Sequence, residues 1–140
     1  MKHYLKIFAF ILALSNIIAQ ESQTTLAILD FEGRGINSLE AATLTDRFTS
    51  EIGKTETMTL VDRTMVEEIL KEQGFQQSGC TTDECAVEVG AMLGVQFMIS
   101  GAIGKLGDTF TIDAKMVSVE SGASVETRNV TYIGKVDGLV

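Results

Sequence analysis

The hydrophobic period of the chain changes at Val95, and this change restricts the folds that the sequence can adopt. Before Val95, short apolar runs alternate with segments whose apolar residues recur every three or four positions, the spacing of one face of a helix. After Val95, apolar residues first form a nearly continuous run and then alternate with polar ones, the spacing of strands. This sequence therefore predicts an α/β domain in which helices separate the early strands and the late strands follow one another directly.

Two strands and three helices are predicted before Val95. The apolar run at 26–31 is too short for a helix, whereas Asn37 followed by Glu40 has the spacing of a capping box at a helix start. Thr64 and Glu67 repeat that spacing. The predicted elements are a strand at 26–31, a helix from Asn37 to Gly53, a strand at 58–61, a helix from Thr64 to Gly74 and a helix from Thr82 to Gly94.

Three consecutive strands are predicted after Val95. The run from Val95 to Ile103 is apolar on both faces, as expected of a central strand. Turns at 107–108 and 121–122 then bound two alternating segments, 110–116 and 125–133. The expected architecture is a mixed sheet of about five strands with helices packed against it, in the order β-α-β-α-α-β-β-β.

The first nineteen residues have the layout of a secretory signal peptide. Lys2 and Lys6 give a basic start, and the apolar stretch that follows is shorter than the about 20 residues that span a bilayer. We predict cleavage after Ala19, which leaves one domain at 20–140 in the periplasm, without stable membrane insertion. No cysteine lies near this point, so no lipid-attachment site of the bacterial lipoprotein kind is expected.

The charge and composition of the cleaved chain argue against several function classes. Loss of Lys2 and Lys6 changes the formal net charge from −8 to −10, a sign that repels nucleic acid and anionic lipid. The sole histidine, His3, leaves with the leader, so no imidazole is left for acid-base catalysis or metal binding. We expect neither an enzyme nor a cofactor, and no catalytic or metal-binding residue is predicted.

Cys80 and Cys85 are predicted to form a disulfide. The exported chain has two cysteines, and an oxidising compartment favours their pairing. Five helical positions would place the two side chains roughly 140° apart, so the bond requires Cys80 to precede the helix. A redox couple or half of a metal site are the functional alternatives, but the spacing is not C-x-x-C and further ligands are absent.

The segment Gly33, Arg34, Gly35 lies between a predicted strand and a helix start, where backbone N–H groups can hold an anion. No Walker-type lysine follows, so a simple turn is favoured over an anion-binding loop. Asp30 and Glu32 could be considered as metal ligands or an acid-base pair, but without a further ligand or base we interpret them as solvated strand-end residues.

Arg63 follows the second predicted strand and has acidic neighbours on both sides. We expect a local ion pair between Arg63 and either Asp62 or Glu67.

Three segments together resemble a group of bacterial periplasmic domains. They are Leu-Ala-Ile-Leu-Asp-Phe-Glu-Gly at 26–33, Val-Asp-Arg at 61–63, and 90–94 leading into Gly-Ala-Ile at 101–103. This pattern resembles the family that includes the curli secretion component CsgG, the penicillin-binding-protein activator LpoB, the flagellar protein FlgO and the amino-terminal domain of TolB. The resemblance covers residues 25–133.

The resemblance implies a non-catalytic interaction or assembly module of the Gram-negative envelope, which binds an envelope protein or itself. A subunit of an outer-membrane secretion or assembly complex is one alternative, and a phosphate- or nucleotide-binding enzyme using Gly33, Arg34 and Gly35 is another. The curli channel and the penicillin-binding-protein activator are lipoproteins, whereas no lipid attachment is expected here. The curli channel also needs extra amphipathic hairpins to build its barrel, and this sequence leaves no room for them. Members of the family usually have a further helix after the last strand. We expect residues 135–140 to be only the beginning of that helix.

Overall fold

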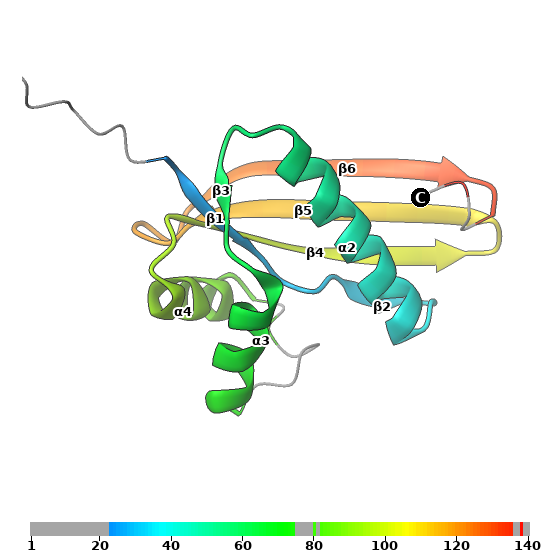
Figure 1. The fold of residues 1–140 in the computed structure, drawn as a ribbon. Coiled ribbons are helices and arrows are strands. Elements are labelled where there is room, and N and C mark those ends of the chain that lie inside the picture. Colours follow the sequence, from blue (N-terminus) through cyan, green and yellow to red (C-terminus); the bar gives the residue numbers. More distant parts are fainter. Residues whose placement is uncertain (1–22, 75–79, 81, 136–137, 139–140) are drawn as a thin grey trace, which may run out of the picture.

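The computed structural model describes residues 23–74, 80, 82–135 and 138, and these form a mixed sheet with helices on both faces (Figure 1). The leader predicted at 1–19, its cleavage site, and most of the expected start of a last helix lie outside these residues. The elements in chain order are β1 (Thr25–Ile28), β2 (Glu32–Arg34), α2 (Ser38–Lys54), β3 (Thr59–Leu60), α3 (Arg63–Glu72), α4 (Asp83–Leu93), β4 (Phe97–Leu106), β5 (Thr109–Ser118) and β6 (Ser124–Ile133).

The sheet has six strands in the order β3-β1-β4-β5-β6, with β2 also paired to β4. β1 runs parallel to both β3 and β4, and the last three strands form an antiparallel meander. The predicted α/β class, the central position of the strand after Val95 and the meander are all confirmed. The sixth strand is β2, which was not predicted because it lies at Glu32–Arg34, after the predicted first strand at 26–31.

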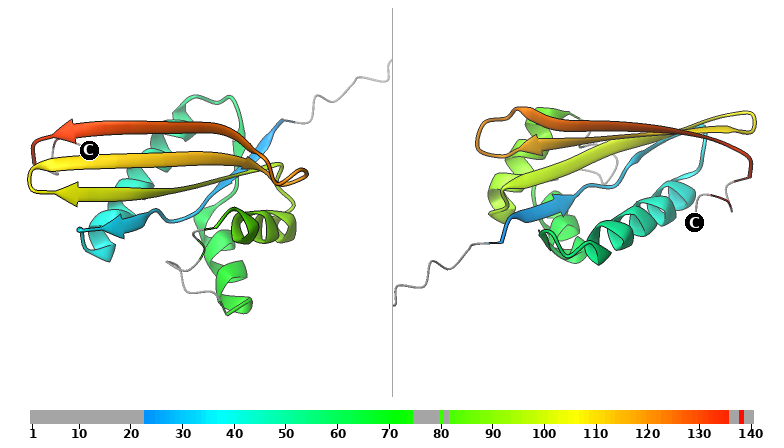
Figure 2. Two further views of the ribbon diagram at one scale, coloured as in Figure 1. Left: turned by 180° about the vertical axis from the view of Figure 1, so that it is seen from behind. Right: turned by 90° about the horizontal axis from the view of Figure 1, so that it is seen from above.

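Two separate cores pack against the two faces of the sheet. Among the described helices, α2 packs on one face, and α3 and α4 pack on the other (Figure 2). Successive residues of one strand point to opposite faces, so Met98 belongs to the core under α3 and α4 while Ile99 belongs to the core under α2. Both side chains are at most 5 % exposed, which explains the continuous apolar pattern of β4.

The helix boundaries confirm two of the predicted starts and correct the third. The side chains of Asn37 and Glu40 form the expected capping box of α2, and Thr82 caps α4. The capping box predicted for Thr64 and Glu67 is wrong, because α3 begins earlier and is capped by the Asp62 carboxylate, which accepts a hydrogen bond from the Thr64 N–H.

The helix ends depend on backbone conformation. Gly94 ends α4 as predicted, in the left-handed conformation that glycine adopts without steric cost. Gly53 does not end α2, which continues to Lys54 and is followed by Thr55 in a right-handed conformation. No left-handed residue is needed at that position, so the glycine there has no capping role.

Gly53 and Gly90 both lie within helices but should respond oppositely to alanine. A Cβ at Gly90 would lie 2.5 Å from Val119 Cγ2 and 2.7 Å from Met98 Cγ, whereas one at Gly53 would lie 3.4 Å from Leu60 Cδ1, an ordinary contact. We expect Gly90→Ala to lower the free energy of unfolding by about 1–3 kcal/mol through overpacking. We expect Gly53→Ala to raise it by up to about 1 kcal/mol through helix propensity.

Urea unfolding of both variants beside the parent chain checks this prediction. Each variant serves as the control for the other because the chemical change is the same. Two shifts of the same sign would contradict the packing described for α4.

Candidate interaction surface

β1 and β2 follow one another along β4 and are separated by a short segment that contains one extra residue. Asp30 lies in this segment and belongs to neither strand. Ile28 pairs with Ile99 and Glu32 pairs with Ala102, so four steps along this stretch match three along β4. One extra residue in a strand is a bulge, a device that redirects a side chain. The predicted continuous strand at 26–31 is therefore wrong in its second half.

Hydrogen bonds hold the interruption in place. The N–H of Leu29 donates to the carbonyl of Ile99 over 2.9 Å, and the N–H of Phe31 donates to Thr45 Oγ1 of α2 over 3.1 Å. The Thr45 hydroxyl itself donates to the carbonyl of Ala41. Thr45 is only 2 % exposed, so its hydroxyl both satisfies a backbone group that the sheet leaves unpaired and keeps its own partner.

Three carboxylates from three elements converge on Arg63. Its guanidinium lies 2.9 Å from Asp30, which follows β1, and 2.9 Å from Glu67 of α3, and it also pairs with Asp46 of α2. The expected pair with Glu67 is present, whereas Asp62 caps α3 instead. The contacts with Asp30 and Asp46 were not predicted, because only the packing of α2 against β1 brings these residues together.

The protonation of Asp30 reflects this half-buried position. Burial raises the pKa of the Asp30 carboxyl above its ordinary value, and the charge of Arg63 opposes that effect only in part. The nearby carboxylates of Glu67 and Asp46 raise the pKa further. Because Arg63 is already paired three times, this cluster connects β1, α2 and α3 and offers no free cation to a ligand.

The segment considered as an anion-binding loop has a different structure. Gly33 and Arg34 lie in β2, where they pair with Ile103 and Gly104 of β4, and only Gly35 has a positive φ, of 80°. The Arg34 side chain is 64 % exposed and pairs with Glu32. Asn37 and Glu40 already occupy the start of α2, so the simple turn predicted here is replaced by a strand followed by a capped helix.

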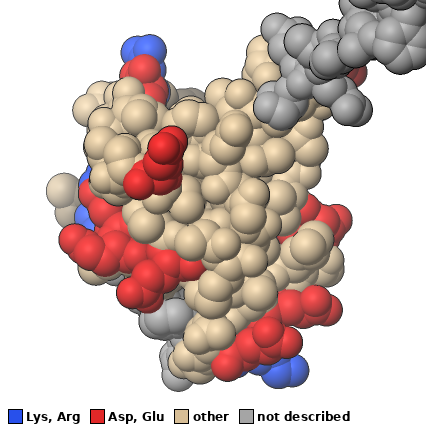
Figure 3. Space-filling view, turned by 90° about the vertical axis from the view of Figure 1, so that its left-hand side faces the viewer, with Lys and Arg blue, Asp and Glu red and all other residues tan. Residues whose placement is uncertain are grey.

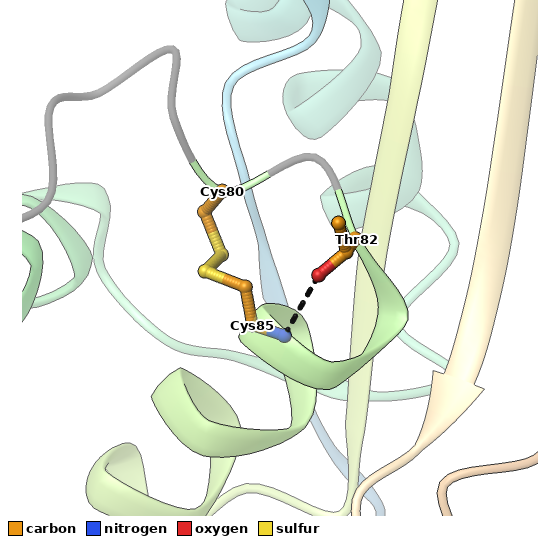
Figure 4. The surroundings of a disulfide bond; sticks show 3 residues. All are labelled: Cys80, Thr82 and Cys85. Atoms are coloured by element: carbon orange, nitrogen blue, oxygen red, sulfur yellow. Dashed lines mark hydrogen bonds between the residues drawn. A yellow bond between two sulfur atoms is a disulfide. The ribbon is translucent and has the colours of Figure 1, made fainter.

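Cys80 and Cys85 form a disulfide, with Cys80 ahead of α4 and Cys85 in its first turn (Figure 4). Their Cα atoms are 5.4 Å apart, within the range that disulfides require. Thr82 Oγ1 accepts a hydrogen bond from the Cys85 N–H, so the same turn is both capped and crosslinked. Cys80 is buried in the core under α3 and α4, so this disulfide fixes the start of α4 against that core.

A hollow of about 340 Å³ opens between α2 and the strands β4 and β5. Its wall is mainly apolar, and Arg47 and Glu51 of α2 form an ion pair of 3.2 Å beside it. The hollow lies on the face of the sheet against which α2 packs. Its lining residues are Phe31, Leu44, Arg47, Phe48, Glu51, Ile103, Ile112 and Gly138.

The charge of the domain is concentrated on α3 and α4. These helices carry six acidic residues, Glu67, Glu68, Glu72, Asp83, Glu84 and Glu88, against two basic ones, Arg63 and Lys71. Figure 3 shows several acidic side chains over the lower part of one face, the level at which α3 and α4 lie, and fewer, separate ones above them.

Removal of the disulfide tests how much it contributes to stability. Closing a loop of this length stabilises a fold by about 2 kcal/mol on the chain-entropy model, so Cys80→Ala with Cys85→Ala should lower the free energy of unfolding by about that amount. Chemical denaturation with and without dithiothreitol measures it. The reductant should destabilise the parent chain equally and leave the double variant unchanged, and a reductant effect on the double variant would contradict the assignment.

Replacement of Arg63 should make stability depend more strongly on pH. Arg63→Met leaves three carboxylates without their cation, and we expect a loss of about 1–3 kcal/mol near pH 7 for this partly buried group. The pKa of Asp30 is higher in the folded state than in the unfolded state, so between these two values the folded state binds more protons. The free energy of unfolding therefore falls as the pH rises through this range.

Thermal melts between pH 4 and 7 should show the loss in Arg63→Met shrinking as the pH falls. Arg34→Met removes an exposed pair with Glu32 and serves as the control, for which we expect no measurable change. A deficit in Arg63→Met that is equal at every pH would refute the role given to the carboxylates.

The comparisons with known proteins agree with this architecture. The family model described as peptidoglycan-synthase activator LpoB matches residues 11–126. No curated protein matches the chain significantly. Among the described residues, no helix has the length and apolar character needed to cross a bilayer.

Solved structures share the fold at low sequence identity. The LpoB C-terminal domain from Salmonella enterica has a TM-score of 0.67 at 14% identity, covering 79% of this chain and 83% of that one. The same domain from Escherichia coli gives 0.65 at 13% identity, with 89% and 93% covered. Lipoprotein GNA1162 from Neisseria meningitidis gives 0.67 at 12% identity, with 80% and 82% covered.

The predicted resemblance is confirmed for one of its named members, while the links to CsgG, FlgO and the TolB amino-terminal domain stay predictions. The family model spans part of the predicted leader, every helix among the described residues, and the meander as far as the start of β6. The chain belongs to the family of the peptidoglycan-synthase activator LpoB.

Proposed function

We propose that the protein is a periplasmic, non-catalytic module that binds a peptidoglycan synthase of its host and increases that enzyme's activity. The observation that carries this proposal is the match of the activator family model to residues 11–126. The members of this family act in the cell envelope as accessory proteins of synthases and not as enzymes themselves. The proposed location agrees with the predicted signal peptide.

The side chains of the described residues favour binding over catalysis. No group of three or more histidine, cysteine or acidic residues among them could hold a metal ion. Both cysteines are joined in a disulfide, and Asp30, whose pKa burial raises, is occupied by Arg63. The charged groups that the fold brings together are thus used to connect structural elements.

We place the synthase contact at the hollow between α2 and the strands β4 and β5. An apolar depression with a few polar groups at its edge is the usual form of a binding site. Phe48 and Ile112 are partly exposed there, and Arg47 offers a charged group beside them. Docking an apolar side chain of the partner into this hollow would bury surface that a single helix leaves open.

The proposal is tested with the purified chain and the peptidoglycan synthases of its host. Glycan polymerisation from lipid-linked precursor should speed up when the chain is added, and Arg47→Glu should weaken binding about tenfold because it reverses a rim charge next to the apolar contact. Lys71→Glu, an exposed reversal of the same kind on α3, is the matched control. Neither variant removes a buried group.

Two results would contradict the proposal. Failure to bind or stimulate any synthase of the host would remove the function itself. Equal weakening by Arg47→Glu and Lys71→Glu would keep the function and reject the site. Release of the chain by osmotic shock, with residues 1–19 removed, checks the proposed periplasmic location separately.

A further inference from the structure

Within the described part of the chain, the sheet has one long edge without a neighbouring strand, formed by β6. In the strand order β3-β1-β4-β5-β6, the edge strand β3 has two residues and β6 has ten. An edge strand carries unpaired N–H and C=O groups, which can pair with a strand of another chain. The difference in length leaves β6 as the edge on which such pairing can extend.

The side chains of β6 lack the features that usually block an edge. Nine of its ten residues are exposed, including Val130 at 57 % and Ile133 at 75 %. Natural proteins protect exposed edges with proline, unpaired charge or short strands. β6 has no proline, and its two charged residues, Glu126 and Arg128, neutralise one another over 3.1 Å.

We propose that β6 pairs antiparallel with β6 of a second copy of this chain, about a two-fold axis at Thr127. In this register Glu126 of each copy lies opposite Arg128 of the other, which gives two ion pairs across the junction. Residues directly opposite each other on an antiparallel pair lie on one face and interact. An axis at Glu126 or at Arg128 would instead place like charges against each other, which is unfavourable.

The distribution of charge over the molecule permits this contact. The acidic residues of α3 and α4 would oppose association of two chains with the same net charge. These helices lie below the sheet in Figure 1, whereas β6 lies at its upper edge, so pairing through β6 keeps the two acidic regions apart.

The paired stretch is short. The register of β6 against β5 shifts between Met116 and Val117, where Val125 has no direct partner, and irregular geometry there limits pairing beyond Val125. We therefore expect a reversible dimer whose population rises with concentration. This inference is independent of synthase binding, because the hollow under α2 and the edge of β6 are different surfaces.

Charge reversal provides the sharpest test. In Arg128→Glu the junction holds only glutamates, and in Glu126→Arg it holds only arginines, so each variant should raise the dissociation constant of the dimer by at least about tenfold. An equimolar mixture of the two variants restores opposite charges at both positions and should dimerise like the parent chain. Sedimentation velocity over a range of concentrations measures all of these species.

The matched controls are reversals away from the edge. Lys71→Glu and Glu68→Arg, both exposed on α3, change the net charge by the same amounts as the two test variants. They should leave the dissociation constant within about twofold, since exposed charges more than a Debye length away are screened. Circular dichroism of every variant verifies that the fold is retained.

A crosslinking experiment tests the register. Thr127→Cys should form an intermolecular disulfide under mild oxidation because the axis brings the two residues together, whereas Thr131→Cys should not. A parent chain that is monomeric at all concentrations, a dimer indifferent to both charge reversals, or crosslinking at 131 and not at 127 would each overturn the proposal. A dimer restored in the mixture of variants and crosslinked at 127 would establish it.

Discussion

The structure depends on the burial of β4 on both faces. This strand pairs in parallel with β1 and β2 on one side and antiparallel with β5 on the other, so it joins the helical half of the chain to the meander. Met98 and Ile99 extend from it into opposite cores. A shift of this strand would disturb both cores, because the helices on the two faces pack against side chains of the same strand.

The uneven covering of the sheet follows from this arrangement. The described helices bury both faces of β1 and β4. They leave β6 exposed on both faces and leave a hollow beside α2. Thr127 and Thr131 are exposed on one face of β6, and Val130 is exposed on the other.

Charge serves two different roles in the molecule. Around Arg63 it connects β1, α2 and α3, in a place where half-burial raises the pKa of Asp30. At the start of α4, Lys115 of β5 contacts the Asp83 carboxylate over 2.9 Å and ties the helix to the meander. The other acidic residues of α3 and α4, Glu68, Glu72, Glu84 and Glu88, are exposed to solvent.

The sequence by itself determined the described helices and every described strand except β2. Local patterns suffice for this: the capping box at Asn37 and Glu40 needs only residues three apart, the left-handed end at Gly94 needs only glycine, and alternation defines each late strand. The disulfide between Cys80 and Cys85 was predictable from an exported chain with two cysteines, and helix geometry required that Cys80 precede α4.

Only the tertiary structure decided the strand order, the bulge at Asp30 and the partners of Arg63. The bulge between β1 and β2 depends on how both strands pair with β4, which is distant in the sequence. Asp46 reaches Arg63 only because α2 packs over β1. The hollow and the free edge of β6 likewise depend on which strands the helices cover. Such features arise from contacts between distant segments, whose register and packing no local periodicity encodes.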